Sequence, residues 1–260
     1  MLPLSEIQSY YPVHLHHRGE FLLREYLQYK ILELLFESDY ALKFSFLGGT
    51  CLRIVHNNNR FSEDLDFDNF DLTSKDFEAV SLLLKKGLEK QGFQIEMRNV
   101  LAGAYHCYIR FPGLLYESGL SGHREAKIRI NLDTEPQGFP FEPESFFLNR
   151  FDVFTSIRST PIDILLSQKI VTMTQRRRPK GRDFFDAVFL FPKTAPNYSF
   201  LDHKLQISNP KALKTYLLEI SQQFDFKELA KDVQPFLFEP RDIKRVELFP
   251  EYIKTLTFES

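Results

Sequence analysis

Two short runs of residues contain the groups that a phosphate and a metal ion require. Gly48, Gly49 and Thr50 follow a short apolar run and precede a helix-compatible stretch. Their backbone N–H groups are therefore expected at a helix start, where phosphates bind. Asp64 and Asp66 follow at positions i and i+2, and on a strand both carboxylates would point to the same face. A phosphate cradle beside paired carboxylates is typical of metal-assisted phosphoryl or nucleotidyl transfer.

Each run also has a simpler interpretation. A glycine pair is common at strand-to-helix turns because glycine tolerates positive φ, and Thr50 could serve only as a helix cap. Acidic pairs often lie on solvated surfaces. Here Phe61, Leu65 and Phe67 alternate onto the opposite, apolar face, which places the two aspartates on a rigid strand. Like charges held there repel each other unless a cation neutralises them, which favours a Mg²⁺ site.

A second group of charged residues lies far downstream. Lys169 stands mid-helix among apolar neighbours, so its ammonium group could lie in water above a buried stem or could face a triphosphate. Asp183 and Asp186 share one helical face, although Asp183 could merely cap the helix. The basic run 176–182 is either a solvated loop or a contact for a nucleic-acid backbone.

Composition narrows the class of protein. The chain has 260 residues, a net charge of -2 and two cysteines. A net charge this close to zero argues against a nucleic-acid-binding protein whose whole surface is basic. Two cysteines are too few for a disulfide framework. The N-terminus lacks a basic start followed by an apolar stretch, and no apolar run is long enough to cross a membrane. We therefore expect a soluble, cytoplasmic protein with no membrane partner.

Periodicity predicts the elements that position these groups. We expect strands at 43–47, 60–67, 93–100, 104–111 and 127–133, and helices at 18–38, 50–56 and 73–91, from 161, at 183–190, and within 209–234 and 241–258. The fold class is therefore α/β (α+β). A mixed core domain is expected over 1–138 and a mainly helical domain over 139–260, with the border inside 139–159.

The order of these motifs resembles one known family. The series GGT-x-L at 48–52, RFSEDLDF at 60–67, KIRINL at 127–132, a helical Lys169 and GRD-x-x-D at 181–186 resembles the AbiEii-type nucleotidyltransferase toxins, the toxin half of type IV toxin–antitoxin (abortive-infection) systems. The resemblance covers residues 20–190. It implies a nucleotidyltransferase-like mixed sheet with flanking helices, followed by a mainly helical C-terminal region that completes the active site. It also implies an NTP substrate, a Mg²⁺ cofactor and a cognate antitoxin.

The resemblance assigns roles to particular residues. The nucleotide phosphates would be held by Gly48, Gly49, Thr50 and Ser62, with Lys169 and Arg182 from the downstream motifs. The catalytic set would be Asp64, Asp66, Lys169 and Asp183, of which Asp64 and Asp66 bind Mg²⁺. Some relatives add nucleotides to the acceptor end of tRNA and thereby stop translation.

One position departs from the family pattern. Relatives often carry an acidic residue about where Asn131 stands, whereas Asp133 has the right parity but lies at the end of its expected strand. The general base that would activate an attacking hydroxyl is therefore either Asp133 or Asp183. Asn131 could also mean a weaker activity.

The sequence thus predicts a nucleotidyltransferase that moves NMP from an NTP to an RNA acceptor, with tRNA the expected acceptor, and releases pyrophosphate. Such a toxin would inhibit translation and growth and would be neutralised by its antitoxin. Two alternatives stay open. The acceptor could be a small molecule or a protein, or the chain could be a catalytically weak NTP-binding module whose chemistry was lost at Asn131.

Overall fold

The computed structural model describes residues 1–176 and 178–257. They form two compact units, which are described separately. The first unit comprises 1–55, 61–138 and 143–159, and the second comprises 56–60, 139–142 and the chain from Thr160 onward. The domain border expected inside 139–159 stays a prediction.

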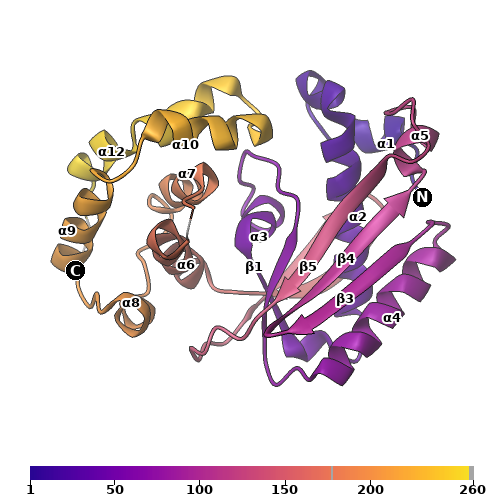
Figure 1. Cartoon of the computed structure of the whole chain (residues 1–260), viewed down its shortest axis with the longest axis horizontal. Helices are drawn as coiled ribbons and strands as arrows, with labels where there is room; N and C mark the ends of the chain where they lie inside the picture. Colours follow the sequence, from indigo (N-terminus) through magenta and orange to yellow (C-terminus); the bar gives the residue numbers. More distant parts are fainter. Residues whose placement is uncertain (177, 258–260) are drawn as a thin grey trace. The chain divides into compact units, whose positions relative to one another are not determined.

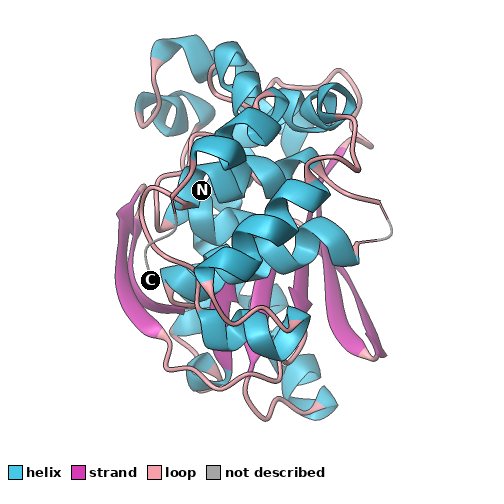
Figure 2. Ribbon diagram, turned by 90° about the vertical axis from the view of Figure 1, so that its left-hand side faces the viewer, coloured by secondary structure: helices cyan, strands magenta, loops and turns pink. Residues whose placement is uncertain are grey.

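The first unit is built on one mixed sheet of seven strands in the order β3-β4-β5-β2-β1-β7-β6. Figure 1 labels β1, β3, β4 and β5, and Figure 2 shows the strands in magenta. β2 pairs with β5, and β1 with β7, in parallel, while the other neighbours are antiparallel. The strands are β1 (Phe44–Leu47), β2 (Leu65–Asn69), β3 (Glu96–Ala102), β4 (Ala104–Pro112), β5 (Lys127–Thr134), β6 (Glu144–Arg150) and β7 (Val153–Ser159).

Helices α2 and α4 pack against each other and cover one face of this sheet. Under them lie the apolar side chains of alternate strand residues, such as Ile128, Ile130 and Leu132 of β5, all fully buried. The residues between them in β5, Arg129, Asn131 and Asp133, point to the other face, as the two-residue period of a strand requires. The helices of this unit are α1 (Leu4–Ser9), η1 (Val13–Arg18), α2 (Gly19–Phe36), η2 (Ala41–Lys43), α3 (Gly48–Ile54), α4 (Ser74–Lys90) and α5 (Leu114–Glu117).

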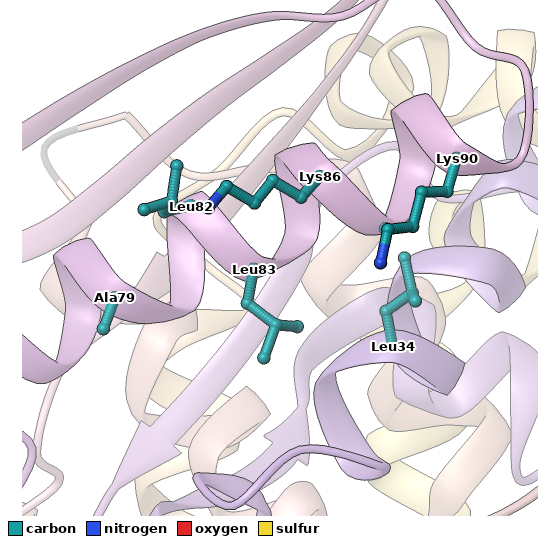
Figure 3. Close-up of a pocket in the computed structure, with 7 residues that line it drawn as sticks. Leu34, Ala79, Leu82, Leu83, Lys86 and Lys90 are labelled. Carbon is teal, nitrogen blue, oxygen red and sulfur yellow. The ribbon is translucent and has the colours of Figure 1, made fainter.

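Helix α4 begins where the helix at 73–91 was expected. Thr73 and Asp76 form a capping box, in which the Thr73 side chain accepts from the Asp76 N–H and the Asp76 carboxylate accepts from the Thr73 N–H. Between α2 and α4 lies a shallow apolar depression of about 420 Å³, lined by Leu34, Ala79, Leu82, Leu83, Lys86, Gly87 and Lys90 (Figure 3). None of the predicted site residues lines it.

The strand expected at 60–67 was placed too early. β2 begins at Leu65, and the chain before it has no ladder partner except an isolated bridge between Arg60 and Leu237. The carbonyl oxygens of this segment are bound by side chains instead of a neighbouring strand. Gln28 Nε2 donates to the carbonyls of Ser62 and Glu63, at 3.1 and 3.0 Å. These donors come from a distant helix, so local alternation could not reveal them.

Two strands were missed. β6 and β7 form a hairpin between the strand predicted at 127–133 and the helix predicted from 161, where no strand was expected. The turn between them places the non-glycine residue Phe151 at a φ of 59°, so the usual glycine signal for a tight turn is missing.

The second unit is helical. Its core contains fully buried aromatic rings, including Phe184, whose centroid lies 5.0 Å from that of Phe249 and 5.2 Å from that of Phe226. Gly181 lets α7 approach α10, because a Cβ atom there would lie 1.8 Å from the carbonyl oxygen of Leu229. The helices are α6 (Ile162–Gln175), α7 (Gly181–Leu190), α8 (Tyr198–Leu205), α9 (Pro210–Ile220), α10 (Phe226–Val233), η3 (Gln234–Phe236), η4 (Pro240–Ile243), α11 (Lys244–Glu247) and α12 (Phe249–Thr255).

Among the described helices, none combines the length and the apolar character that a membrane crossing requires.

Candidate active site

The turn between β1 and α3 brings the backbone close to Asp66. Gly48 is the first residue of α3 and has a φ of 79°. A Cβ atom at this position would lie 2.3 Å from Oδ2 of Asp66. Glycine is therefore required for both the backbone conformation and the close approach. The structure brings together one predicted phosphate-binding residue and one predicted metal ligand.

Thr50 and Ser62 both help to fix the segment that precedes β2. Thr50 is fully buried, and its hydroxyl group donates a hydrogen bond to the carbonyl oxygen of Asp64. The N-cap of α3 is Leu47, so the side chain of Thr50 does not cap this helix. The carbonyl oxygen of Ser62 accepts the bond from Gln28 described above.

The acidic side chains of β2 and β5 lie on the same face of the sheet. Asp66 stands directly opposite Asp133 in the parallel ladder, one position beyond the pair Leu65 and Leu132. Asp64 comes just before β2, and its Oδ1 accepts a hydrogen bond from the N–H of Asn131 at 3.3 Å. Asp133, which was expected at the end of its strand, therefore lies beside Asp66.

The environment of Asp64 disfavours its negative charge. Burial raises the pKa of this carboxyl group, the N–H of Asn131 lowers it, and the nearby charge of Asp133 raises it again. The net result is a pKa above the ordinary value of 3.8. A bound cation would reverse this balance, because an opposite charge close by favours the carboxylate.

His106 was missed by the sequence interpretation. It stands opposite Asp133 in the β4–β5 ladder, and its Nδ1 lies 2.8 Å from Oδ1 of Asp133. Both side chains are 33% exposed. Strands were predicted at 104–111 and 127–133, but only the pairing register of β4 and β5 brings the two residues together.

The second unit places Lys169 among carboxylates. Its Nζ lies 2.9 Å from Oδ2 of Asp186 and 3.2 Å from Oδ1 of Asp183. The side chains of all three residues are at most 11% exposed. The interpretation of Lys169 as a stem with its charged head in water is therefore wrong, because the ammonium group is buried and paired.

Arg60 and Asn58 complete this buried cluster. Arg60 donates from Nε and Nη2 to the two oxygens of Asp186, at 2.7 and 2.6 Å, and Asn58 Nδ2 donates to Oδ1 of Asp186 at 2.8 Å. Arg60 is the first residue of the motif RFSEDLDF and has no predicted role. No sequence signal joins Arg60 to Asp186, because the two residues are 126 positions apart.

In this cluster, the cations and the carboxylates each stabilise the charged form of the other, as their pKa values show. Burial lowers the pKa of Lys169, but the charges of Asp186 and Asp183 together raise it above its ordinary value. Burial raises the pKa of Asp186, and the charges of Arg60 and Lys169 outweigh this effect and lower it. Lys169 and Asp186 are therefore both charged at neutral pH.

The basic residues around 176–182 have individual partners. Arg176 Nε lies 3.4 Å from Oδ2 of Asp183, and Lys180 Nζ lies 3.8 Å from Oδ1 of Asp232. The guanidinium group of Arg182 stacks over the ring of Phe236 at 4.5 Å. The predicted basic run also includes Arg177, which lies outside the described residues.

The predicted site residues fall into two groups. Gly48, Gly49, Thr50, Ser62, Asp64 and Asp66 belong to the first unit, and Lys169, Arg182 and Asp183 belong to the second. Within its unit, the structure joins Gly48 with Asp66, and Lys169 with Asp183. The composite site formed by both groups stays a prediction.

The carboxylates of the first unit fit a small divalent cation that also binds substrate. In the described part of the chain, no group of three or more His, Cys, Asp or Glu side chains is arranged to hold a metal ion. Mg²⁺ commonly uses only one or two carboxylates and completes its shell with phosphate oxygens and water. Asp64 and Asp66 match this donor set, and the missing Cβ of Gly48 leaves Oδ2 of Asp66 against the start of α3.

Comparison with known proteins places the chain in a family. Residues 30–246 match the family described as "Nucleotidyl transferase AbiEii toxin, Type IV TA system". A search of curated protein sequences finds no significant match.

Several solved structures share the fold. The JHP933 protein from Helicobacter pylori is 17% identical with a TM-score of 0.55, over 90% of this chain and 91% of that one. A nucleotidyltransferase from H. pylori, described there as putative, is 18% identical with a TM-score of 0.56, over 90% and 94%. MenT4, a nucleotidyltransferase toxin from Mycobacterium tuberculosis H37Rv, is 15% identical with a TM-score of 0.56, over 98% and 91%.

These structures confirm the predicted fold class, a mixed sheet with flanking helices. The family match covers most of the chain and agrees with the motif series read from the sequence. The chain therefore belongs to the AbiEii nucleotidyl transferase toxin family of type IV toxin–antitoxin systems.

Proposed function

We propose that the protein transfers a nucleoside monophosphate from an NTP to an RNA acceptor, with tRNA as the expected acceptor, and releases pyrophosphate. The observation that carries this proposal is the approach of Asp66 to the Gly48 turn, with Asp64 and Asp133 on the same side of the sheet. This arrangement supports the proposal, because N–H groups at a helix start suit a phosphate and neighbouring carboxylates suit a metal ion.

In the proposed reaction, the N–H groups of Gly48, Gly49 and Thr50 hold the phosphates of the NTP, and Ser62 contributes to the same contact. Asp64 and Asp66 would hold a Mg²⁺ ion, which would supply stabilisation of the negative charge that develops on the phosphates. A hydroxyl oxygen of the acceptor forms a bond to the α-phosphorus while the bond to the pyrophosphate oxygen breaks. Asp133 accepts the hydroxyl proton.

Asp133 suits the role of base better than Asp183. It is partly exposed on the carboxylate face, and its Oδ1 is held by His106, which leaves Oδ2 to accept a proton. Asp183 is buried, and both of its oxygens face cations, Lys169 and Arg176. These pairs occupy both carboxylate oxygens of Asp183 and shield it from an acceptor.

The residues of the second unit are proposed to act on the leaving group. Lys169 would neutralise the leaving β- and γ-phosphates, with Arg182 beside it as a further nucleotide-binding residue. The raised pKa of Lys169 supports this role, because it keeps the ammonium group charged. To meet a phosphate, Lys169 would exchange one of its carboxylate partners for the substrate. Asp183 is the weaker of the two partners, with the longer distance of 3.2 Å.

The basic residues from Arg176 to Arg182 are proposed to bind the RNA backbone. Arg178 is exposed, which suits a phosphate contact. We expect Arg178→Ala to weaken tRNA binding and to reduce its dependence on salt. The matched control is Arg124→Ala, an exposed arginine of the first unit whose guanidinium lies over the ring of Tyr116. Equal tRNA affinity for Arg178→Ala and the wild type would favour a small-molecule or protein acceptor.

The proposed biological role is that of a cytoplasmic toxin. Modification of tRNA would stop translation and growth, and a cognate antitoxin encoded in the neighbouring gene would restore growth. Expression in a test host should inhibit growth in the wild type but not in the Asp64→Ala variant. Normal growth of the host, together with no transfer to any substrate, would support the rival interpretation as an NTP-binding module.

The decisive experiment is incubation of the purified protein with each labelled NTP, Mg²⁺ and total cellular RNA. We expect one RNA band to take the label, and EDTA to abolish the labelling. Asp66→Ala should remove transfer while leaving the circular dichroism spectrum and the unfolding transition unchanged. Transfer by Asp66→Ala at the wild-type rate would overturn the proposal.

A further inference from the structure

The outer strand of the sheet has an unusual surface for a free edge. β6 is the last strand in the sheet order and pairs only with β7 among the described strands. Free edges are usually protected by charges, proline or short length, because their unpaired backbone groups can recruit another strand. The charged residues of β6, Glu144 and Arg150, stand only at its two ends, and its centre, Phe146-Phe147-Leu148, contains no charge and no proline. The backbone groups of such an edge are available to pair with another strand.

Two aromatic rings lie exposed on the outer face of this hairpin. Phe147 of β6 is 73% exposed and Phe154 of β7 is 67% exposed. They are diagonal neighbours in the ladder, with ring centroids 5.9 Å apart and planes inclined by 19°. Helix α2 packs on the opposite face of β7, where Val153, Thr155 and Ile157 are buried. The two rings therefore form a small apolar patch that is exposed on the outer face of the sheet.

The residues of β6 are complementary to themselves in an antiparallel register. If two copies of β6 pair with Phe147 at the centre, Phe147 lies opposite Phe147, Phe146 opposite Leu148, Ser145 opposite Asn149 and Glu144 opposite Arg150. Each polar residue then meets a polar residue, and each apolar residue meets an apolar one. The single acid of the strand meets its single base.

We propose that β6 is the interface of a homodimer, in which the edges of two copies pair antiparallel around Phe147. The two sheets then join into one, and Phe154, Phe147 and their two equivalents form a continuous aromatic row on the outer face. The arrangement closes after two copies, because pairing about a two-fold axis uses the same edge of both. This inference does not depend on the proposed enzymatic activity.

The aromatic residues are expected to contribute more to the stability of the dimer than the pair of Glu144 and Arg150. Arg150 already donates from Nη2 to the carbonyl oxygen of Tyr10 at 2.7 Å, and its guanidinium group lies 4.7 Å from the centroid of Tyr11. Glu144 is exposed and has no cation partner among the described residues. The partner's glutamate would thus add to the contacts of a guanidinium group that is already fixed. An edge pair of this length is small for a stable interface, so the dimer should dissociate in the micromolar range.

The test is sedimentation velocity of the full chain over a micromolar concentration series. We expect a reversible monomer–dimer equilibrium in the wild type and a monomer for Phe147→Lys at every concentration. Leu82→Lys, which changes a 51% exposed leucine on α4, is the matched control and should dimerise like the wild type. Circular dichroism checks that both variants are folded. A wild type that stays monomeric, a dimer that persists in Phe147→Lys, or a polymer that grows with concentration would each overturn the proposal.

A cross-linking experiment tests the register. The double variant Ser145→Cys/Asn149→Cys places a cysteine opposite a cysteine in the paired strands, whereas within one strand these positions are about 13 Å apart, too far for a disulfide. We expect a covalent dimer on mild oxidation of the double variant and none for Ser145→Cys alone. Both native cysteines are buried, so they should not interfere. A covalent dimer of the single variant at equal yield would contradict this register.

Discussion

The carboxylate of Asp186 binds the guanidinium group of Arg60 through two hydrogen bonds, of 2.7 and 2.6 Å, and both side chains are at most 2% exposed. A bidentate pair of this kind is among the stronger polar contacts in proteins. Lys169 occupies the same carboxylate at 2.9 Å. Asp186 therefore balances two buried cations, one of which is a predicted nucleotide-binding residue.

The first prediction concerns the stability that this carboxylate provides. Asp186→Asn keeps the shape of the side chain but leaves two buried cations with too little negative charge. We expect the free energy of unfolding to fall by about 3–5 kcal/mol, as when a buried ion pair loses one partner. Urea unfolding followed by circular dichroism measures this change. Glu96→Gln removes the exposed pair with Lys127 and should leave the unfolding midpoint nearly unchanged. Equal effects of the two substitutions would contradict the role assigned to the buried cluster.

The second prediction concerns pH. The pKa of Asp186 in the folded protein lies below its ordinary value of 3.8, because Arg60 and Lys169 outweigh the effect of burial. The carboxylate therefore stabilises the fold above this value, and its contribution is lost as the pH falls through the folded-state pKa. We expect the difference in unfolding free energy between wild type and Asp186→Asn to be constant near neutrality and to shrink below about pH 4. Denaturant titrations at several pH values between neutral and acidic conditions test this. A difference that grows on acidification would contradict the assignment.

The third prediction concerns the turn before α3. Gly48→Ala introduces a Cβ atom 2.3 Å from Oδ2 of Asp66 at a φ of 79°. The carboxylate of Asp66 must move, so nucleotidyl transfer should fall steeply, beyond what lost stability explains. Gly92→Ala is the matched control, because Gly92 has a φ of 92° but its added Cβ meets no atom within 4 Å. The control should lose only about 1–2 kcal/mol of stability and keep its activity. Rates of transfer from labelled NTP, measured below the melting temperature of each variant, separate the two effects.

Local sequence patterns predicted those parts of the fold that depend on near neighbours. The helix expected at 73–91 and the strand expected at 127–133 each need only a few residues of context, and both are present in the structure, as α4 and β5. The start of β2 was misplaced because Gln28, on a distant helix, binds the carbonyls that a strand would otherwise pair. Whether a carbonyl finds a side chain or a strand depends on tertiary structure.

The candidate site also combines residues that local patterns predict with contacts that only the tertiary structure creates. The spacing of Asp64 and Asp66 and the glycine at position 48 were visible in the sequence, and the structure places Gly48 against Asp66. His106 and Asp133 meet only through the register of β4 and β5, and Arg60 meets Asp186 across 126 positions. Contacts of this kind have no local signature, so the sequence alone left the general base undecided.

The last prediction decides between the two rivals for that base. Asp133 lies partly exposed opposite Asp66, with one oxygen held by His106, and Asp183 is buried against Lys169. Asp133→Asn should therefore lower kcat by roughly 10²–10⁴-fold, the usual contribution of a general base, while NTP affinity and the unfolding midpoint stay close to the wild type. Asp183→Asn should first lower the free energy of unfolding, because Lys169 loses a buried partner.

The measurements are kcat and KM for transfer to RNA, NTP binding by calorimetry, and urea unfolding, for both variants and for the wild type. A stable Asp183→Asn variant with a large loss of kcat, beside an active Asp133→Asn variant, would move the base to Asp183. His106→Gln gives a further check, because it weakens the hold on Oδ1 of Asp133 without removing the carboxylate. It should reduce kcat less than Asp133→Asn does and leave KM for the NTP unchanged. A positioning residue acts only through the group it holds, so His106→Gln should have no further effect on kcat in the Asp133→Asn background.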